Sequence, residues 1–387
     1  IYGGLILLDL FILYHTATRG AILGLLGGAF VSSIILVILN RENKFIRKVS
    51  IGIIALVFVV VASIFIFKDS SVVKNSPVLS RFASISLDEA TTKSRFLIWD
   101  MSWQGVKENP VLGWGQDNYI LVFNKYYDPK MYGQEPWFDR SHNVFFDWLI
   151  AGGFLGLLAY LSIFVTALYY IFRPNGKFSN IEKGVLAGLL SAYFFQNIFV
   201  FDNMISYLMF FSVIAYINWR DMEDQEVKNK YINNNKNDAK NTWLDITYPV
   251  SVIIALFFVL YFANIKPIIA STTLIQSLSP QQAGPSKNLE YFEKVFSLGT
   301  FGSGEAREQL IQAALRIQSF PNASQGIKQK FFDLAVKEMN TQISENPKDA
   351  RYELFFGSFL NKFGLYDEAI KRLDRARELS PKKQSIL

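Results

Sequence analysis

The sequence predicts an all-α, polytopic α-helical membrane protein with a long external loop and a C-terminal helical repeat domain. Three observations support this fold class. Long stretches lack charged residues, basic residues gather beside those stretches, and the C-terminal part changes to an amphipathic pattern. Of the 387 residues, 51% are hydrophobic and 16% are aromatic. The mean hydropathy is +0.20.

Membrane spans are expected wherever about 18 or more apolar residues follow one another, because about 20 residues cross the hydrocarbon core. Residues 1–14 resemble the last part of such a span. They carry Asp9 and no initiator Met, so we expect the chain to begin inside a larger protein, with no signal peptide to interpret. The other expected spans are residues 20–39, 51–67, 148–172, 184–201, 204–219 and 249–265.

Loop charge predicts the orientation of these seven spans, because basic loops stay in the cytoplasm. Residues 40–50 carry four basic residues against one acid, and residues 173–183 carry three against one. Both are predicted to be cytoplasmic. The predicted parts are transmembrane helices at 1–67, an external catalytic loop at 68–143, transmembrane helices at 144–219, a cytoplasmic linker at 220–248, a transmembrane helix at 249–266 and an external repeat domain at 267–387.

The C-terminal part shows a tetratricopeptide-like pattern. Pro347 lies one repeat length before Pro381, and Ala335 and Met339 occupy the positions that a preceding repeat needs. An ordinary helical hairpin is the alternative. Such repeats bind proteins, so a protein partner is expected. The positions that carry the pattern of the last repeat are Phe356, Gly357, Leu360, Gly364, Tyr366, Ala369, Leu373, Ala376 and Pro381.

Composition excludes several classes of site. The chain has no cysteine, which removes disulfides, thiolate metal sites and cysteine nucleophiles. Its two histidines cannot form a histidine-rich metal site, although carboxylate ligands remain available. Composition therefore leaves only a carboxylate site as a weak possibility for a metal. The net charge of +6 is modest and its basic residues lie beside the spans, so no nucleic-acid partner is expected.

The external loop is too long and too aromatic to be a simple connection. Residues 94–108 can form an amphipathic helix, with Phe96, Trp99, Trp103 and Val106 on one face. This face could lie in the membrane interface or pack against the spans of the protein itself. Trp114 follows, between two glycines. Aromatic rings of this kind can stack on the apolar C–H faces of sugars.

His142 is the principal candidate for chemistry, since its imidazole can exchange a proton near neutral pH. Asn143 follows it, and Asp147 lies one helical turn later, either as an end-of-helix charge or as a partner of the imidazole. His15 is read first as an interfacial residue.

Three arginines border the same predicted membrane face, namely Arg19, Arg95 and Arg140. A guanidinium group binds phosphate through two parallel hydrogen bonds and stays charged. Interfacial arginines also extend towards lipid headgroups, and this is the alternative reading.

Together these residues resemble the C-terminal part of the O-antigen ligase and O-antigen polymerase superfamily, which includes bacterial O-oligosaccharyltransferases. The resemblance covers about residues 19–219, but the sequence lacks the family's N-terminal spans, which help to shape the lipid groove. Many members of the wider group also carry C-terminal tetratricopeptide repeats. The matching residues are Thr18-Arg19-Gly20, Ser94-Arg95 with Trp99, Pro110, Gly113, Gly115, His142-Asn143, Gly152-Gly153 and Gly156.

The resemblance implies transfer of a glycan from undecaprenyl diphosphate to an acceptor hydroxyl at the outer face of the bacterial cytoplasmic membrane. Such transfer serves the synthesis of lipopolysaccharide or another surface polysaccharide, without cofactor or metal. It implies that His142 is the catalytic base and that Arg19 and Arg95 bind the diphosphate, while Arg140 is added for its proximity. Trp99, Trp114 and Asn143 are expected to contact substrate.

Several choices stay open at the level of sequence. The acceptor could be a glycan, a lipid or a protein, and the reaction could be ligation or polymerisation. A membrane transporter and a non-catalytic anchor that presents the repeats are the competing functions. Convergence of Arg19, Arg95 and His142 in one cavity would favour the enzyme. A polar path through the bilayer would favour the transporter. Scattered positions of these residues would favour the anchor.

Overall fold

A computed structural model describes residues 2–16, 18–84, 89–134, 136–174, 176–233 and 242–386, with side chains described outside residues 2, 223–233 and 242–246. The chain divides into two compact units, residues 1–236 and 237–387, which are treated separately here. Every regular element in the described ranges is a helix, as the predicted fold class requires.

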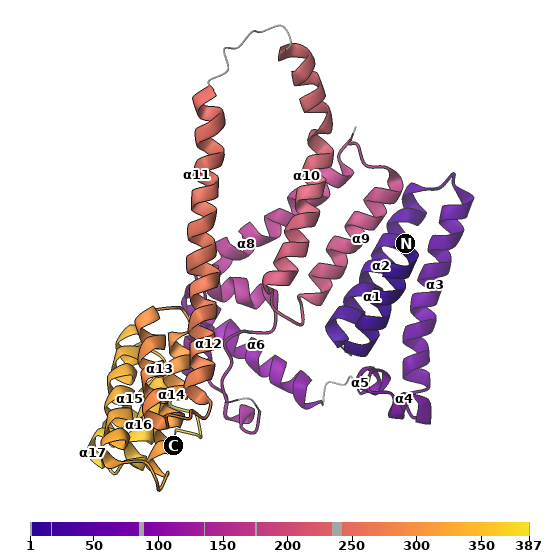
Figure 1. Ribbon diagram of the computed structural model, residues 1–387. Coiled ribbons are helices and arrows are strands. Elements are labelled where there is room, and N and C mark those ends of the chain that lie inside the picture. The colour runs from indigo at the N-terminus through magenta and orange to yellow at the C-terminus, as the bar shows by residue number, and fades with distance from the viewer. Residues whose placement is uncertain are drawn as a thin grey trace. The chain divides into compact units, whose positions relative to one another are not determined.

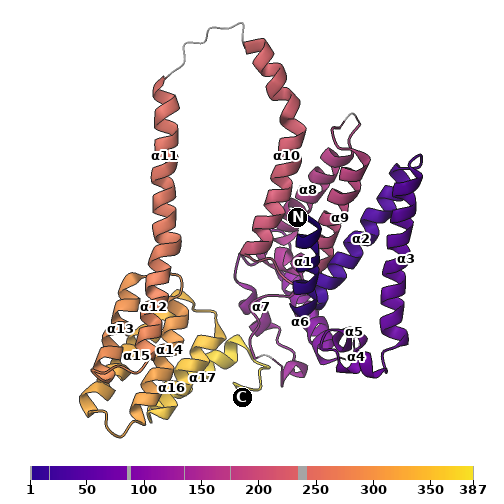
Figure 2. The same ribbon diagram turned by 45° about the vertical axis from the view of Figure 1, so that its right-hand side comes forward.

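The first unit is a bundle of long helices with shorter ones in the segment between α3 and α8 (Figures 1 and 2). In both views α9 lies beside α2, and α3 follows on the other side of α2. The elements are α1 (Tyr2–Thr16), α2 (Arg19–Leu39), α3 (Lys44–Ile66), α4 (Ser71–Asn75), α5 (Leu79–Ala83), α6 (Ala90–Glu108), α7 (Tyr119–Lys125), η1 (Pro129–Met131), α8 (Val144–Phe172), α9 (Asn180–Gln196) and α10 (Met204–Asn233).

Four helices among the described residues are long and apolar enough to cross a membrane, as expected of a multi-pass membrane protein. They are Arg19–Leu39, Lys44–Ile66, Val144–Phe172 and Thr247–Leu278. Gly3–Thr16 is a shorter apolar helix. α9, with 17 residues, and α10 are not both long and apolar enough to be counted among these four helices. The spans predicted there therefore remain predictions.

The ends of several helices differ from the sequence-based expectation. α3 begins at Lys44, before the apolar run, because the Asn43 side chain accepts hydrogen bonds from Phe45 N and Ile46 N. α9 was expected to run to Phe201 but ends at Gln196, and residues 197–203 form a separate connection. α10 continues beyond residue 219 to Asn233, so this part of the predicted linker is helical.

Small residues allow α2 and α9 to approach closely. A Cβ atom at Gly28 would lie 2.5 Å from the Cβ of Ala192, and one at Gly188 would lie 2.5 Å from the Cβ of Ser32. Close backbone contact of this kind supplies van der Waals packing where lipid removes the usual hydrophobic driving force. It holds the first residue of α2, Arg19, at a defined place beside the C-terminal end of α9.

α8 is interrupted in its middle, where Gly153 has φ +62° and ψ −160°. The backbone of residues 110–115 fills the break. Trp114 N donates to Ile150 O at 2.6 Å and Gly115 N donates to Ala151 O at 3.1 Å. In the other direction, Phe154 N donates to Pro110 O at 2.7 Å. Since unpaired backbone groups are very unfavourable in a bilayer, the segment replaces the hydrogen bonds that the helix loses.

α6 forms where an amphipathic helix was predicted, and the predicted face is buried in part. Val106 is buried and Trp99 packs against the core, whereas Phe96 and Trp103 are 49% and 42% exposed, as a face in the membrane interface would be. The core around α6, α7 and the first half of α8 extends to the neighbouring face of α6. The buried residues of α6 are Ser94, Ile98, Met101, Ser102, Gly105 and Val106.

The second unit consists of consecutive helices that pair as antiparallel hairpins, α12 with α13, α14 with α15, and α16 with α17 (Figures 1 and 2). α12 continues the helix that was predicted to end near residue 265. The elements are α11 (Thr242–Leu260), η2 (Tyr261–Ile265), α12 (Lys266–Leu278), α13 (Pro285–Leu298), α14 (Ser303–Gln318), α15 (Gln325–Glu345), α16 (Ala350–Lys362) and α17 (Tyr366–Leu379).

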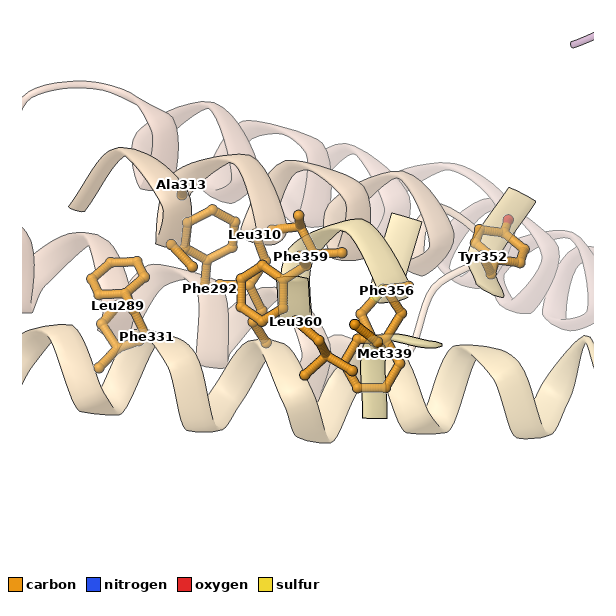
Figure 3. Packing of buried hydrophobic residues seen from close by; sticks show 14 residues of the cluster. Leu289, Phe292, Leu310, Ala313, Phe331, Met339, Tyr352, Phe356, Phe359 and Leu360 are labelled. Atoms are coloured by element: carbon orange, nitrogen blue, oxygen red, sulfur yellow. The ribbon is translucent and has the colours of Figure 1, made fainter. Parts of the chain in front are cut away.

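This unit has its own hydrophobic core, in which Phe292, Phe331 and Phe359 are almost completely buried (Figure 3). A Cβ atom at Gly357 would lie 2.8 Å from Leu373 Cγ, so glycine allows α16 and α17 to pack closely, as the repeat pattern required. Stacked hairpins of this kind occur both in tetratricopeptide repeats and in ordinary helical hairpins. Their assignment as tetratricopeptide repeats remains a prediction.

Replacing Gly153 with alanine should destabilise the first unit, whereas Gly152→Ala should be nearly neutral. A Cβ atom at Gly153 would overlap the carbonyl group of Val111, and an L-residue at this φ and ψ, which essentially only glycine adopts, costs about 1–3 kcal/mol before any clash. A Cβ atom at Gly152 has no atom within 4 Å. Thermal unfolding in detergent, followed by tryptophan fluorescence, measures the difference. Equal midpoints for the two variants would contradict the role given to the break.

Candidate functional site

His142 occupies a constrained position immediately before α8. Its φ is +53°, a region that few non-glycine residues adopt. Its ring packs edge-on against Phe138 and Phe201, with centroids 5.7 and 5.2 Å away. Asn143 is buried and caps α8, because its side-chain oxygen accepts hydrogen bonds from the backbone N–H groups of residues 145 and 146. The imidazole is therefore held at the N-terminus of a membrane helix.

The backbone before His142 is fixed by two side chains. Asp147 Oδ1 accepts hydrogen bonds from Ser141 N at 2.8 Å and from Ser141 Oγ at 2.6 Å. The indole Nε1 of Trp99 donates to Ser141 O at 3.2 Å. Trp99 and Asn143 were expected to contact substrate, and both groups are engaged in bonds that shape the turn around His142. Asp147 acts on that turn through Ser141.

Arg19 and Arg95 lie in one charged cluster with Glu89. Arg19 Nη1 is 2.8 Å from Glu89 Oε2, and its Nη2 donates to Ser84 Oγ at 3.3 Å. The hydrogen bond and the charge of Arg19 hold the pKa of Glu89 below its usual value. Burial, together with the positive charge of Arg19, lowers the pKa of Arg95, while Glu89 opposes this. Glu89 is thus bonded to Arg19, and its charge also acts on Arg95.

Arg95 is the less engaged of the two arginines. Its guanidinium carbon lies 6.0 Å from the ring centroid of Phe199, and within the described ranges it forms no hydrogen bond or ion pair. A partly buried guanidinium with unused donors is favourably placed to bind an anion.

Residues 197–201, in the connection between α9 and α10, join the two parts of the site. Phe199 lies beside Arg95, and Phe201 contacts both His142 and Arg140, whose guanidinium carbon is 5.9 Å from the ring centroid. The Cα atoms of the two phenylalanines are at most roughly 7.6 Å apart. This connection was missed from sequence because its residues were assigned to a continuous span. The polar Asn197, at the end of the apolar run, was the available signal for a helix end.

Arg140 has a different environment from the other two arginines. It forms an ion pair with Asp117, with 2.8 Å between Nη2 and Oδ1. It also lines a small cavity of about 60 Å³ that includes Asp147 and Asp202. Its charge is opposed by these carboxylates, so it is less available to an anion than Arg95.

Trp114 contributes to packing more than the sequence indicated. Its indole Nε1 donates to Gly105 O at 2.9 Å, which ties the segment of residues 110–115 to α6. Lys125 Nζ lies 5.5 Å from the centroid of the indole ring. Among the described residues, no group of three or more acidic or histidine side chains is placed to hold a metal ion.

Part of the first unit is similar to a known protein family. Residues 4–161 match the model of a family described as O-antigen ligase. The match supports the O-antigen ligase superfamily for this part of the chain and points to a membrane glycosyltransferase of the ligase or polymerase type. It contains Arg19, Arg95 and His142 and ends within α8, before the connection that carries Phe199 and Phe201. No curated protein and no solved structure matches the chain.

Ser141→Ala should loosen the turn around His142. Ser141 is fully buried, and its hydroxyl bonds to both Asp147 and the backbone oxygen of Asn143, at 2.8 Å. Leaving such groups without a partner costs about 1–3 kcal/mol. Thermal unfolding in detergent should show a lower midpoint. Ser162→Ala is the control, because this exposed serine lies within α8 and its hydroxyl bonds only to Ala159 O among the described residues. A control that unfolds as early as Ser141→Ala would refute the assignment.

Proposed function

We propose that the protein is a membrane glycosyltransferase of the O-antigen ligase or polymerase type. It moves a glycan from undecaprenyl diphosphate to an acceptor hydroxyl during the synthesis of a cell-surface polysaccharide such as lipopolysaccharide. The observation that carries this proposal is the grouping of charges around residues 197–201. Arg19 and Arg95 lie together on one side of this connection, and His142 packs against Phe201 on it.

His142 serves as the general base in this reaction. Its imidazole accepts the proton of the acceptor hydroxyl as the oxygen attacks the anomeric carbon of the donor glycan. The bond between that carbon and the diphosphate oxygen breaks, and its electron pair leaves with the diphosphate. The new glycosidic bond forms in the same transfer, so one proton and one leaving group balance the step.

Arg19 and Arg95 stabilise the leaving group. Negative charge develops on the diphosphate as the bond breaks, and fixed cations are most effective where charge develops in the transition state. Arg95 has unused donors and Arg19 is held beside it, so together they can bind oxygens of both phosphates. Their gathering favours the enzyme over the anchor, for which scattered positions were expected.

The proposed location is the bacterial cytoplasmic membrane, with the site at the outer face. The loop of residues 68–143 and the helical unit of residues 267–387 lie outside the cytoplasm in this arrangement. The helical unit recruits the acceptor or a protein partner, whereas transfer takes place in the first unit. The bilayer and the lipid-linked donor are the other partners.

Labelling of single cysteines in intact cells tests the orientation. The chain contains no cysteine, so Ser71→Cys and Ser286→Cys each introduce one thiol, and both positions are exposed. Both should react with a membrane-impermeant maleimide, because positive-inside counting places both outside. Reaction at residue 71 with protection at residue 286 would show that the last span or the helical unit is wrongly oriented.

Substitutions at the site test the chemistry. His142→Ala should lower transfer by about 100- to 10,000-fold, since this is the usual contribution of a general base. Arg19→Lys and Arg95→Lys should also be impaired, because lysine keeps the charge and loses the two-pronged geometry. Arg140→Lys should be milder, as Arg140 is already paired with Asp117.

The assay measures transfer by the protein in membranes that contain a defined undecaprenyl-diphosphate glycan. Donor binding serves as the control, because His142→Ala should leave it nearly unchanged. Wild-type turnover by this variant would rule out the base assignment and favour the transporter or anchor.

A further inference from the structure

The second unit contains a large pocket that the proposed transfer chemistry does not use. It has a volume of about 660 Å³, within the range of roughly 300–1,000 Å³ that is usual for small-molecule sites. The turn between α13 and α14, the start of α14, the second half of α15 and the start of α16 form its wall. The pocket lies within one compact unit and is built from its helical hairpins.

A buried arginine forms part of this wall. Arg307 is only 6% exposed, and its Nε donates to Glu338 Oε2 at 3.2 Å. Its Nη1 donates to Gln342 Oε1 and to Glu345 Oε2, both at 2.6 Å. A buried charge needs such compensation. The side chain of Glu345 nevertheless remains 55% exposed, so part of the network faces the pocket opening.

The charges of this network are largely compensated within it. Arg307 is buried and its Nε and Nη1 are already bonded, so it offers little positive charge to an anion, which the two carboxylates would repel. The remaining negative charge lies on Glu345, whose exposed carboxylate is screened by water. Gln342 is only 3% exposed and its Oε1 accepts from Arg307, whereas the exposed Asn346 lines the pocket with an amide that can donate and accept. A neutral ligand that both donates and accepts hydrogen bonds therefore fits the wall best.

Aromatic groups complete the pocket. Phe301 is 85% exposed at the turn between α13 and α14, and the half-buried Phe296 precedes it. Tyr352 also lines the pocket, and its hydroxyl oxygen accepts a hydrogen bond from Arg351 Nη2 at 2.8 Å. An exposed phenylalanine beside a polar network suits a ligand with both apolar and hydroxyl-bearing faces. Covering the aromatic ring removes a large apolar area from water, which contributes favourable binding free energy.

We propose that this pocket binds a neutral, hydroxyl-rich glycan segment, at a site separate from the transfer chemistry. Sugar hydroxyls both donate and accept hydrogen bonds, and the C–H face of a sugar ring can cover Phe301. The choice of a glycan over another neutral ligand rests on the proposed function. The pocket would hold a glycan while its end is extended or attached.

Binding to the full chain in detergent tests the proposal. The probe is the repeat-unit oligosaccharide released by mild acid from the surface polysaccharide of the host, and trilysine is the competing cationic probe. Phe301→Ala should weaken oligosaccharide binding about five- to tenfold, the usual effect of losing one aromatic contact. Phe320→Ala removes another exposed phenylalanine of this unit, 48% exposed and outside the pocket, and should have no effect.

Glu345→Gln provides a second variant that preserves shape and removes a charge. Oligosaccharide binding should change by less than about threefold, because the amide still donates and accepts hydrogen bonds. The proposal is overturned if the wild-type protein does not bind the oligosaccharide, if Phe301→Ala binds it as well as wild type, or if trilysine binds more tightly and depends on Glu345.

The same measurements separate this proposal from the transfer reaction. His142→Ala should bind the oligosaccharide normally, because His142 lies in the first unit. Oligosaccharide binding that depends on Phe301, in a protein with no transfer activity, would refute the proposed reaction and leave the pocket assignment intact. Transfer activity in a protein that does not bind the oligosaccharide through Phe301 would refute the pocket assignment and leave the proposed reaction intact.

Discussion

The site depends on the backbone pairing between the interrupted α8 and residues 110–115. At the break around Gly153 the helix cannot satisfy its own N–H and C=O groups, and the inserted segment supplies partners for them. That segment continues directly from α6, which carries Arg95 and Trp99, while α8 begins just after His142. One set of backbone hydrogen bonds therefore determines how a candidate anion-binding arginine is placed relative to the candidate base.

Sequence alone predicted the helices well and their ends less well. Apolar runs identify the spans because hydropathy is a local property, and α2, α3 and α8 contain the stretches expected from it. The buried face of α6 was predicted only in part, since Trp99 and Val106 pack in the core while Phe96 and Trp103 are exposed, and periodicity alone does not distinguish these environments. The end of α9 was misjudged because Phe199 and Phe201 are as apolar as the helix before them.

Individual site residues could be proposed from sequence, but their relations could not. Gly113 and Gly153 were noted as separate motifs, and only the structure shows that their segments pair with one another. Likewise, the side chains of Trp99 and Asn143 were expected to contact substrate, whereas both are bonded to backbone around His142. Such contacts join residues 36 to 44 positions apart or depend on a turn geometry that composition does not encode.

The ion pair between Arg19 and Glu89 affects how a phosphorylated ligand would enter and leave. In the proposed reaction the diphosphate takes the place of a carboxylate already bound to Arg19, so association is an exchange of anions. The net affinity is then the difference between two interactions and is weaker than that of an uncompensated arginine pair. In the same proposal, Glu89 would bind Arg19 again after transfer and displace the diphosphate product. An internal counter-anion of this kind would limit product inhibition and favour repeated turnover.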